Sequence, residues 1–290
     1  MIIINMACGL ANRMFQYAFY LSLKERGYDA KVDFYKSAKL AHENVLWNDI
    51  FPCAKIDQVS TFKVFMLGGG ANIISRFRRK YMPSSTKVIT MSTAFDTDLR
   101  IGADRNDKYV IGVFQNAAVV ESASRRVQEC FSFVPFTDER NVRLEKEMQV
   151  CESVAIHVRK GDDYRQRIWY QNTCPVEYYR NAVEEMKSRL KEPRFYVFTD
   201  NPDWVREHFT GFEYTLVDGN PVSGWGSHFD MQLMSCCKHN IISNSTYSWW
   251  GAYLNGNNDK IVICPNIWFN PDSCDEYTSG KLLCKGWLAL

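Results

Sequence analysis

The chain has 290 residues, enough for two ordinary domains or one large domain at about 150 residues per domain. Its 35 lysines and arginines nearly balance 33 aspartates and glutamates, and a formal net charge of +2 provides no field that would gather DNA or RNA. A hydrophobic content of 46% with 23% charged residues is typical of a globular chain and argues against long disorder.

The first 35 residues predict a βαβ unit. Residues 2–6 form a short apolar strand, and a helical stretch follows the turn that contains Gly9. This stretch ends at Arg26, before Gly27, which suits a helix C-cap. An extended pattern returns at residues 29–34. Such an opening is typical of a Rossmann-type half.

The middle of the chain is harder to interpret. Between residues 60 and 108 the pattern weakens, with three glycines at 68–70 and a basic cluster at Arg76, Arg78, Arg79 and Lys80. Residues 109–114 then predict a strand and 118–131 a helix. A charged helix-like stretch at 138–149 marks the expected join between two α/β domains, 1–150 and 151–290.

The second half alternates strands with helices. We expect strands at 153–158, 194–199, 213–217, 240–243 and 260–264, and helices at 175–191, 202–209, 228–238 and 246–255. Five strands joined by four crossovers predict a parallel, doubly wound sheet. Ligands of such sheets collect at the carboxyl ends of the strands, so the residues that follow each strand are the candidates for a site.

The strand at 153–158 ends in a polar cluster. With a period of two, His157 and Arg159 point to one face, and Gly161 lets the backbone turn ahead of Asp162. The planar fork of arginine can hold a phosphate through two parallel hydrogen bonds. An ion pair of Arg159 with Asp162 or Asp163 would explain the same residues without a ligand.

Two later strands also deliver polar residues. Asp200 stands where the strand at 194–199 stops, and its carboxylate could accept hydrogen bonds from a guanine edge or from ribose hydroxyls. A helix N-cap ahead of Pro202 is the simpler alternative. Asn244, Ser245 and Thr246 lead from a buried strand into a helix, whose hydroxyls and unpaired N–H groups would form an anion site without a metal. Plain N-capping is the alternative there.

A short signature and four further blocks carry a resemblance to a known family. Residues 157–162 resemble the H-x-R-x-G-D signature of the α1,2-, α1,6- and protein O-fucosyltransferases. The chain as a whole resembles the bacterial α1,2-fucosyltransferases of glycosyltransferase family 11. Its supporting blocks are 9–18 (similar to G-L-G-N-Q-M-F-Q-Y-A), 112–115 (G-Y-x-Q), 198–200 (F-x-D) and 238–250 (K-H-x-I-I-x-N-S-T-x-S-W-W). The chain departs from the pattern at Ala11, Arg13 and Lys160, where the family has glycine, glutamine and more often arginine.

The resemblance implies a GT-B architecture, two Rossmann-like doubly wound domains that face a cleft. The first domain would bind the acceptor and the second GDP-β-L-fucose. The implied reaction is the inverting transfer of L-fucose to the 2-hydroxyl of a terminal galactose in an oligosaccharide or polysaccharide, with no metal cofactor. Fucosyl transfer with a different linkage is the nearest alternative.

The resemblance also suggests a role for each residue. Arg159 would stabilise the leaving diphosphate, helped by the helix start at Ser245 and Thr246. His157 and Asp200 would bind the guanosine, while Asn244 and Gly9 belong to the loops around the nucleotide sugar. Asp162 would act as the general base or would only orient Arg159. Asn12, on the glycine turn, would orient a sugar by hydrogen bonds.

Three alternatives come from other classes of protein. Asp96 and Asp98 match the short D-x-D motif of metal-dependent GT-A transferases, although a surface acidic turn explains them as well. A nicotinamide-dependent oxidoreductase would need G-x-G-x-x-G, and Gly9 has no partner glycine at 11 or 14. A non-catalytic carbohydrate-binding protein would have no need of a diphosphate site.

The remaining features concern the compartment. The ten cysteines include no C-x-x-C pair, which favours buried free thiols, and Trp249 and Trp250 are expected in the core. No window resembles a membrane span, and residues 1–5 lack a signal-peptide pattern, so we expect a cytoplasmic protein. The cluster between Arg76 and Lys80 would allow weak peripheral contact with the inner face of the membrane, although a solvated helix face explains it equally well.

Overall fold

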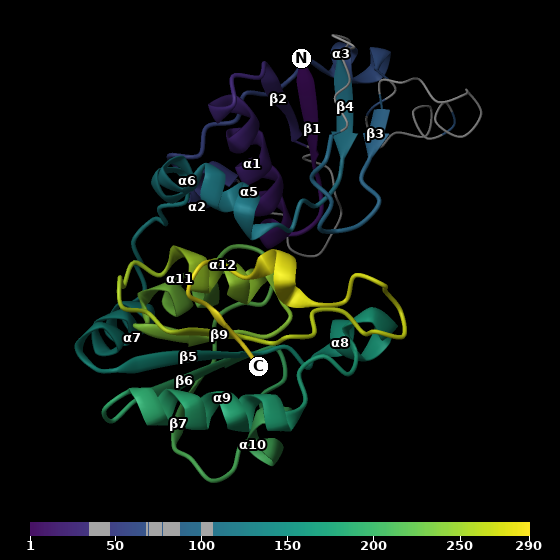
Figure 1. Ribbon diagram of the computed structural model, residues 1–290. Helices are drawn as coiled ribbons and strands as arrows, with labels where there is room; N and C mark the ends of the chain where they lie inside the picture. The colour runs from purple at the N-terminus through teal and green to yellow at the C-terminus, as the bar shows by residue number, and fades with distance from the viewer. Residues whose placement is uncertain (35–46, 68, 70–76, 78–87, 100–106) are drawn as a thin grey trace. The chain divides into compact units, whose positions relative to one another are not determined.

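The chain forms two compact units, Met1–Ser132 and Phe133–Leu290 (Figure 1). The computed structural model describes residues 1–34, 47–67, 69, 77, 88–99 and 107–290. Gly68, Gly70 and the basic cluster at Arg76, Arg78, Arg79 and Lys80 lie outside the described residues. Within the described ranges, no helix has both the length and the hydropathy that crossing a membrane requires.

The first unit contains a parallel sheet of four strands in the order β2-β1-β4-β3. Its strands are β1 (Ile2–Met6), β2 (Ala30–Phe34), β3 (Val88–Thr90) and β4 (Lys108–Ile111). Its described helices are α1 (Leu10–Glu25), α2 (Trp47–Ile50), α3 (Thr61–Met66), α5 (Ala117–Ser122) and α6 (Ser124–Cys130).

The predicted βαβ unit is confirmed. Helix α1 ends where Gly27 adopts a φ of +80°, a conformation that glycine takes without steric cost. Almost all of its residues from Ala11 to Leu23 are buried, and the helix packs on β1, β2 and α5. The prediction was less accurate farther along, because the strand at 109–114 stops at Ile111 and the helix at 118–131 is divided at Ala123.

The second unit contains a parallel sheet of six strands in the order β10-β9-β8-β5-β6-β7. These are β5 (Ser153–Val158), β6 (Arg194–Thr199), β7 (Tyr214–Val217), β8 (His239–Ile241), β9 (Val262–Cys264) and β10 (Leu288–Ala289). Its helices are α7 (Glu139–Val150), α8 (Asp162–Gln166), α9 (Val176–Arg189), α10 (Pro202–His208), α11 (Phe229–Cys236) and α12 (Thr246–Leu254), with 3₁₀ helices at Ile168–Tyr170 and Ser279–Leu282. The five expected strands are present, and β10 adds a sixth.

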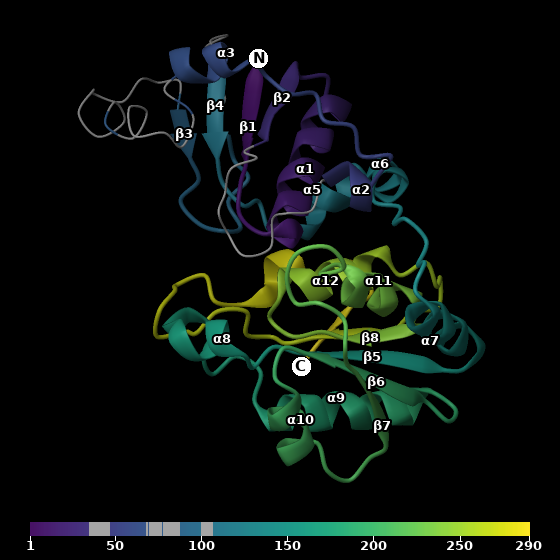
Figure 2. The ribbon, with the colours of Figure 1, turned by 180° about the vertical axis from the view of Figure 1, so that it is seen from behind.

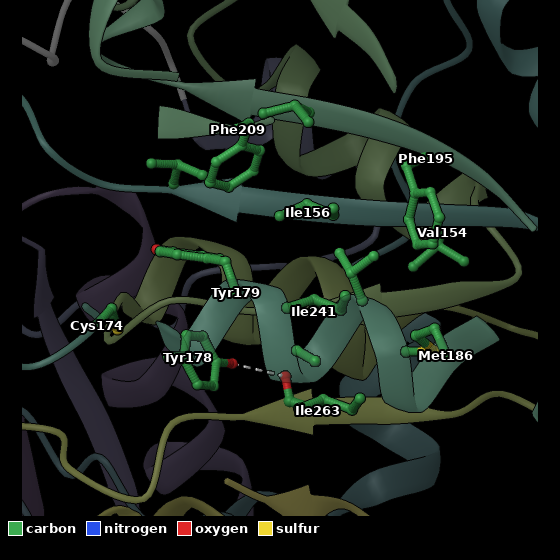
Figure 3. Close-up of a cluster of buried hydrophobic side chains, with 14 of the residues drawn as sticks. Val154, Ile156, Cys174, Tyr178, Tyr179, Met186, Phe195, Phe209, Ile241 and Ile263 are labelled. Carbon is green, nitrogen blue, oxygen red and sulfur yellow. Dashed lines mark hydrogen bonds between the residues drawn. The ribbon is translucent and has the colours of Figure 1, made fainter. Parts of the chain in front are cut away.

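Helices cover both faces of this second sheet. Figure 2 shows α9 and α10 on one face and α11 and α12 on the other. All six residues of β5 are buried, as expected for a central strand of a parallel sheet. On the α9 side, Tyr178 and Tyr179 pack with Ile156 in a buried hydrophobic cluster, and the Tyr178 hydroxyl donates to the Ile263 carbonyl oxygen at 3.3 Å (Figure 3).

The division between the units lies after Ser132 and not after residue 150, where the sequence placed it. Helix α7 belongs to the second unit because it packs on α11. Polar contacts hold it there as well: the Asn141 side chain donates to Asn220 Oδ1 at 2.9 Å, and the Tyr196 hydroxyl donates to Glu147 at 2.8 Å. A charged helix therefore marks the start of the second unit and not the end of the first.

Two expectations about burial can be compared with the structure. Trp249 and Trp250 are both fully buried, so their assignment to the core is confirmed. All ten cysteines are free thiols. Cys53 is nevertheless exposed, so the expectation of burial does not hold for every one of them.

Candidate active site

The carboxyl ends of β5 and β8 are joined by a side-chain hydrogen bond. His157 ends β5 together with Val158, and its Nδ1 lies 2.8 Å from Ser243 Oγ, just beyond β8. Both side chains are buried. Burial, helped by the nearby Arg159 charge, lowers the pKa of His157 to about 3. The imidazole is therefore neutral at physiological pH and can act only as a hydrogen-bonding group.

Asp200 joins the ends of β5 and β6. Its Oδ1 accepts two hydrogen bonds of 2.8 Å, from the backbone N–H groups of Lys160 and Gly161. The next residue, Asn201, donates from Nδ2 to the Lys160 carbonyl at 3.0 Å. Asn201 is also the N-cap of α10, since its Oδ1 accepts from Trp204 N at 3.2 Å. The N-cap alternative for Asp200 is therefore wrong, because its neighbour holds that position.

Gly161 is required by this arrangement. A Cβ atom at this position would lie 2.7 Å from Asp200 Oδ2, closer than real contacts allow. The Asp200 side chain remains in contact with solvent, but it loses hydration against the protein, and this desolvation raises its pKa. The two N–H donors and the Arg159 charge act in the opposite direction. A carboxylate oxygen thus remains at the sheet edge beside a positive charge.

Aromatic rings hold the two cations of the β5 loop. The Arg159 guanidinium carbon lies 4.3 Å from the centre of the Tyr170 ring, and the Lys160 ammonium lies 3.9 Å from that of Tyr164. Lys160 is buried, whereas Arg159 is partly exposed. A guanidinium that stacks on a ring keeps its N–H groups directed outward in its own plane, where they can bind an oxyanion.

Asp162 begins α8 and forms an ion pair with Arg165 on the same helix. Both side chains are largely exposed. This pair is local to the helix, so the carboxylate lies at the surface of the second unit.

The three candidate residues at the start of α12 differ in burial and in hydrogen bonding. Asn244 is buried, and its amide donates to the Trp268 carbonyl at 3.1 Å, so its side chain serves the interior of the unit. Ser245 is the N-cap residue, but its side chain makes no capping hydrogen bond. The plain capping role is therefore not the one that Ser245 has. Thr246 is partly exposed at the first position of the helix.

Gly9 and Asn12 lie in the first unit, at the start of α1. Gly9 is the N-cap with a φ of −71°, and a Cβ atom there would meet nothing within 4 Å. The left-handed residue of this turn is Cys8, with a φ of 75°. Asn12 Oδ1 accepts a hydrogen bond of 3.0 Å from Gln115 Nε2, beyond the end of the neighbouring strand β4.

The Asp96 carboxylate accepts hydrogen bonds from residues of its own turn. Asp96 Oδ2 accepts from the Ser92 backbone N–H and hydroxyl at 3.2 and 2.8 Å, and Oδ1 accepts from Asp98 N at 3.0 Å. Among the described residues, no group of three or more His, Cys, Asp and Glu side chains is placed to hold a metal ion.

Residues 109–288, more than half of the chain, match the model of Glycosyl transferase family 11. The chain belongs to glycosyl transferase family 11. It is a glycosyltransferase, and the alternative of a nicotinamide-dependent oxidoreductase is therefore wrong.

Relatives of this family 11 protein differ in what their names specify. An α-1,2-colitosyltransferase of Escherichia coli is 26% identical over 285 residues, 95% of each chain. The O-antigen biosynthesis glycosyltransferase WbnK of Escherichia coli is 30% identical over 196 residues, 64% of this chain and 62% of WbnK. Galactoside alpha-(1,2)-fucosyltransferase 1 of Ateles belzebuth is 32% identical over 109 residues, which cover 36% of this chain and 29% of the relative.

Solved structures of fucosyltransferases share the fold. The fucosyltransferase NodZ from Bradyrhizobium aligns with a TM-score of 0.55 and 13% identity over 86% of this chain and 91% of its own. A variant of Arabidopsis thaliana FUT1 in complex with GDP aligns with a TM-score of 0.53 and 13% identity over 91% of this chain and 70% of its own. The fold of this family 11 chain is of the GT-B type, with a parallel sheet in each of two α/β units. The GT-A alternative is therefore wrong.

Sequence reasoning overlooked two residues that contact the candidates. Ser243 bonds to His157 and lies inside the block at 238–250, directly before the candidates Asn244, Ser245 and Thr246. Gln115 bonds to Asn12 and closes the block at 112–115. Both residues lie within blocks that carry the resemblance to the family. Their roles could not be predicted, because the sequence does not show that the end of β5 contacts the loop after β8, or that the start of α1 contacts the loop after β4.

Proposed function

We propose that this family 11 enzyme is a galactoside 2-α-L-fucosyltransferase. It would transfer L-fucose from GDP-β-L-fucose, with inversion, to the 2-hydroxyl of a terminal galactose. The observation that carries the proposal is the junction of β5 and β6, where Asp200 fixes the loop that bears Arg159. The names of the relatives support it, because two of the three specify an α-1,2 linkage and one specifies a galactoside acceptor.

In this proposal the second unit binds the donor. Arg159, partly exposed and stacked on Tyr170, directs its N–H groups at the diphosphate and stabilises the charge that builds up as the bond to fucose breaks. Neutral His157 and the accessible Asp200 oxygen bind the guanosine by hydrogen bonds. The start of α12 at Ser245 and Thr246 contributes N–H and hydroxyl donors.

The acceptor in this proposal binds to the first unit. Asn12, at the start of α1, lies at the carboxyl edge of its sheet, where ligands of doubly wound folds collect. Asn12 would orient a sugar hydroxyl. Asp162 is the proposed general base, which removes the proton from the attacking hydroxyl as the fucosyl bond forms. Its exposed position leaves the carboxylate accessible.

A second donor is supported by one observation. The relative that aligns over 95% of this chain is named a colitosyltransferase, and colitose is the 3-deoxy form of L-fucose. The same site would accept both sugars unless a residue contacts the 3-hydroxyl of the transferred fucose. In chemical terms, the two candidate functions differ only in that one group.

The test is product analysis. The purified protein is incubated with GDP-fucose or GDP-colitose and a panel of β-galactosides, and the linkage of any product is determined by NMR. We expect an α1,2-linked fucosyl galactoside. A product made only from GDP-colitose would replace the donor in the proposal, and a product with another linkage or another acceptor sugar would contradict it.

A further inference from the structure

Two glutamines with different hydrogen bonding lie at the carboxyl edge of the first sheet. Gln16, on α1, is satisfied at both ends of its amide: Oε1 accepts from Ala7 N at 3.0 Å, and Nε2 donates to the Gly112 carbonyl at 2.8 Å. It thereby ties the loop after β1 to the loop after β4. Gln16 has the contacts of a structural residue.

Gln115 is satisfied at only one end. Its backbone N–H donates to the Ala94 carbonyl at 2.8 Å, and its Nε2 donates to Asn12 Oδ1 at 3.0 Å, so the side chain is held in place. Its Oε1 is buried, yet none of the described residues donates to it. Buried polar atoms in native proteins almost always have a partner, because desolvating an unpaired acceptor is costly.

The position of this oxygen indicates a ligand. Gln115 follows β4 and Asn12 follows β1, and these two strands are neighbours in the sheet, so both residues lie at the edge where ligands of such folds bind. Asn12 is partly exposed beside it. An amide oxygen accepts hydrogen bonds and repels anions, so the partner that it requires is a neutral donor such as a sugar hydroxyl, not a phosphate.

We propose that Gln115 Oε1 accepts a hydrogen bond from a hydroxyl group of the acceptor sugar and that Asn12 holds the amide in the orientation for this contact. The proposal rests on the proposed function, because it takes the first unit as the acceptor-binding one. Because this oxygen is buried in the free enzyme, the groups that cover it must move aside as the acceptor binds, and the oxygen then becomes paired. Gln115 therefore selects for the sugar that carries this hydroxyl.

The test compares Gln115→Met with the matched control Gln16→Met. Methionine keeps the length of the side chain and removes its polar atoms. Sugar affinity is measured by titrating β-galactosides into the enzyme–GDP complex, alongside GDP affinity and melting temperature. We expect Gln115→Met to weaken galactoside binding at least tenfold with GDP affinity unchanged. We expect Gln16→Met to lower the melting temperature more, because it removes two hydrogen bonds between loops.

Deoxygenated sugars identify the contact. The wild-type complex should lose affinity for one monodeoxy galactoside, and Gln115→Met should no longer distinguish that analogue from the parent sugar. If Gln115→Met is too unstable to titrate, Gln115→Leu serves instead: it also lacks an acceptor oxygen and should likewise fail to discriminate. Discrimination that is the same in wild type and in the variant titrated would overturn the proposal.

These titrations need no transfer reaction, so they separate the two proposals. Galactoside binding that depends on Gln115 in a protein that transfers no fucose would support the role of Gln115 and refute the proposed function. A wild-type complex that binds no galactoside would refute the role of Gln115, while product analysis would still judge the proposed function.

Discussion

At the residue scale, the site depends on close contacts around Asp200. The carboxylate holds the backbone of Lys160 and Gly161 by hydrogen bonds that a one-atom change could disturb. Such contacts cannot be derived from sequence, because they join residues about 40 positions apart. The sequence singled out both residues at strand ends, Asp200 for a ligand and Gly161 for a turn, but it did not predict the contact between them.

Gly161→Ala tests this junction. The added Cβ would lie 2.7 Å from Asp200 Oδ2, so the carboxylate must move, and we expect a loss of about 1–3 kcal/mol in the free energy of unfolding together with weaker GDP binding. Gly9→Ala is the control, because its φ is −71° and the space is open. Urea unfolding measures both variants. Equal stability of Gly161→Ala and wild type would refute the importance of the contact.

Asp162→Asn tests the proposed base. Asparagine cannot take up the proton, so we expect kcat to fall by a factor of about 10²–10⁴ with GDP affinity unchanged. The control is Arg165→Gln, which removes the ion pair but leaves the carboxylate. It should keep kcat near the wild-type value. If both variants lose activity equally, the pair matters for structure and Asp162 is not the base.

His157 gives a prediction about pH. Its pKa is about 3 in the folded chain, whereas an ordinary histidine titrates near 6.5. Between these values the unfolded chain binds a proton that the folded chain does not, so stability falls as the pH drops from about 6.5 toward 3. This contribution is up to about 1.4 kcal/mol per pH unit. The variant His157→Gln should therefore show a shallower loss between pH 6.5 and 5 in urea unfolding. Parallel curves for the two proteins would contradict the burial of a neutral imidazole.

At the element scale, strands with a buried apolar pattern were predictable, and strands without one were not. Strands β5 and β6 have an apolar pattern because helices cover both faces of their sheet, and that pattern identified them from sequence. The three-residue strands β8 and β9 are fully buried and were identified in the same way. Strands β3 and β10 are not buried, and pairing with a neighbouring strand defines them. Helix α8 was missed because its five residues are too few to show a helical period.

Helix α12 provides a prediction at this scale. Replacing a serine that caps a helix costs about 0.5–2 kcal/mol, but Ser245 makes no capping hydrogen bond. We therefore expect Ser245→Ala to leave the free energy of unfolding nearly unchanged and to weaken GDP binding. Asp138→Ala is the matched control, because the Asp138 side chain accepts from Asn141 N at the start of α7. Thermal unfolding should show a loss for the control alone, and an equal loss for Ser245→Ala would assign it a capping role.

At the scale of the whole molecule, the sequence predicted two α/β units but placed their division too late. The charged stretch at 138–149 read as a join because it is polar, yet α7 packs on α11 and belongs to the second unit. Amphipathic surface helices and connecting segments have similar composition, and only packing distinguishes them. The proposed assignment of GDP-fucose to the second unit and of the acceptor to the first comes from the resemblance to the fucosyltransferases, not from the packing of the two units.

In the proposed function, Arg159, at the edge of the second sheet, holds the diphosphate of a GDP-sugar without a metal ion. Calorimetric titration of GDP in excess EDTA tests it most directly, with wild type, Arg159→Ala and the control Arg167→Ala, an exposed arginine near the aromatic ring of Trp169. We expect GDP to bind wild type and Arg167→Ala equally with or without EDTA, and Arg159→Ala to bind about 30- to 100-fold more weakly, the equivalent of 2–3 kcal/mol. Loss of wild-type GDP binding in EDTA would show that a metal ion is needed, and normal GDP binding by Arg159→Ala would show that Arg159 does not hold the diphosphate.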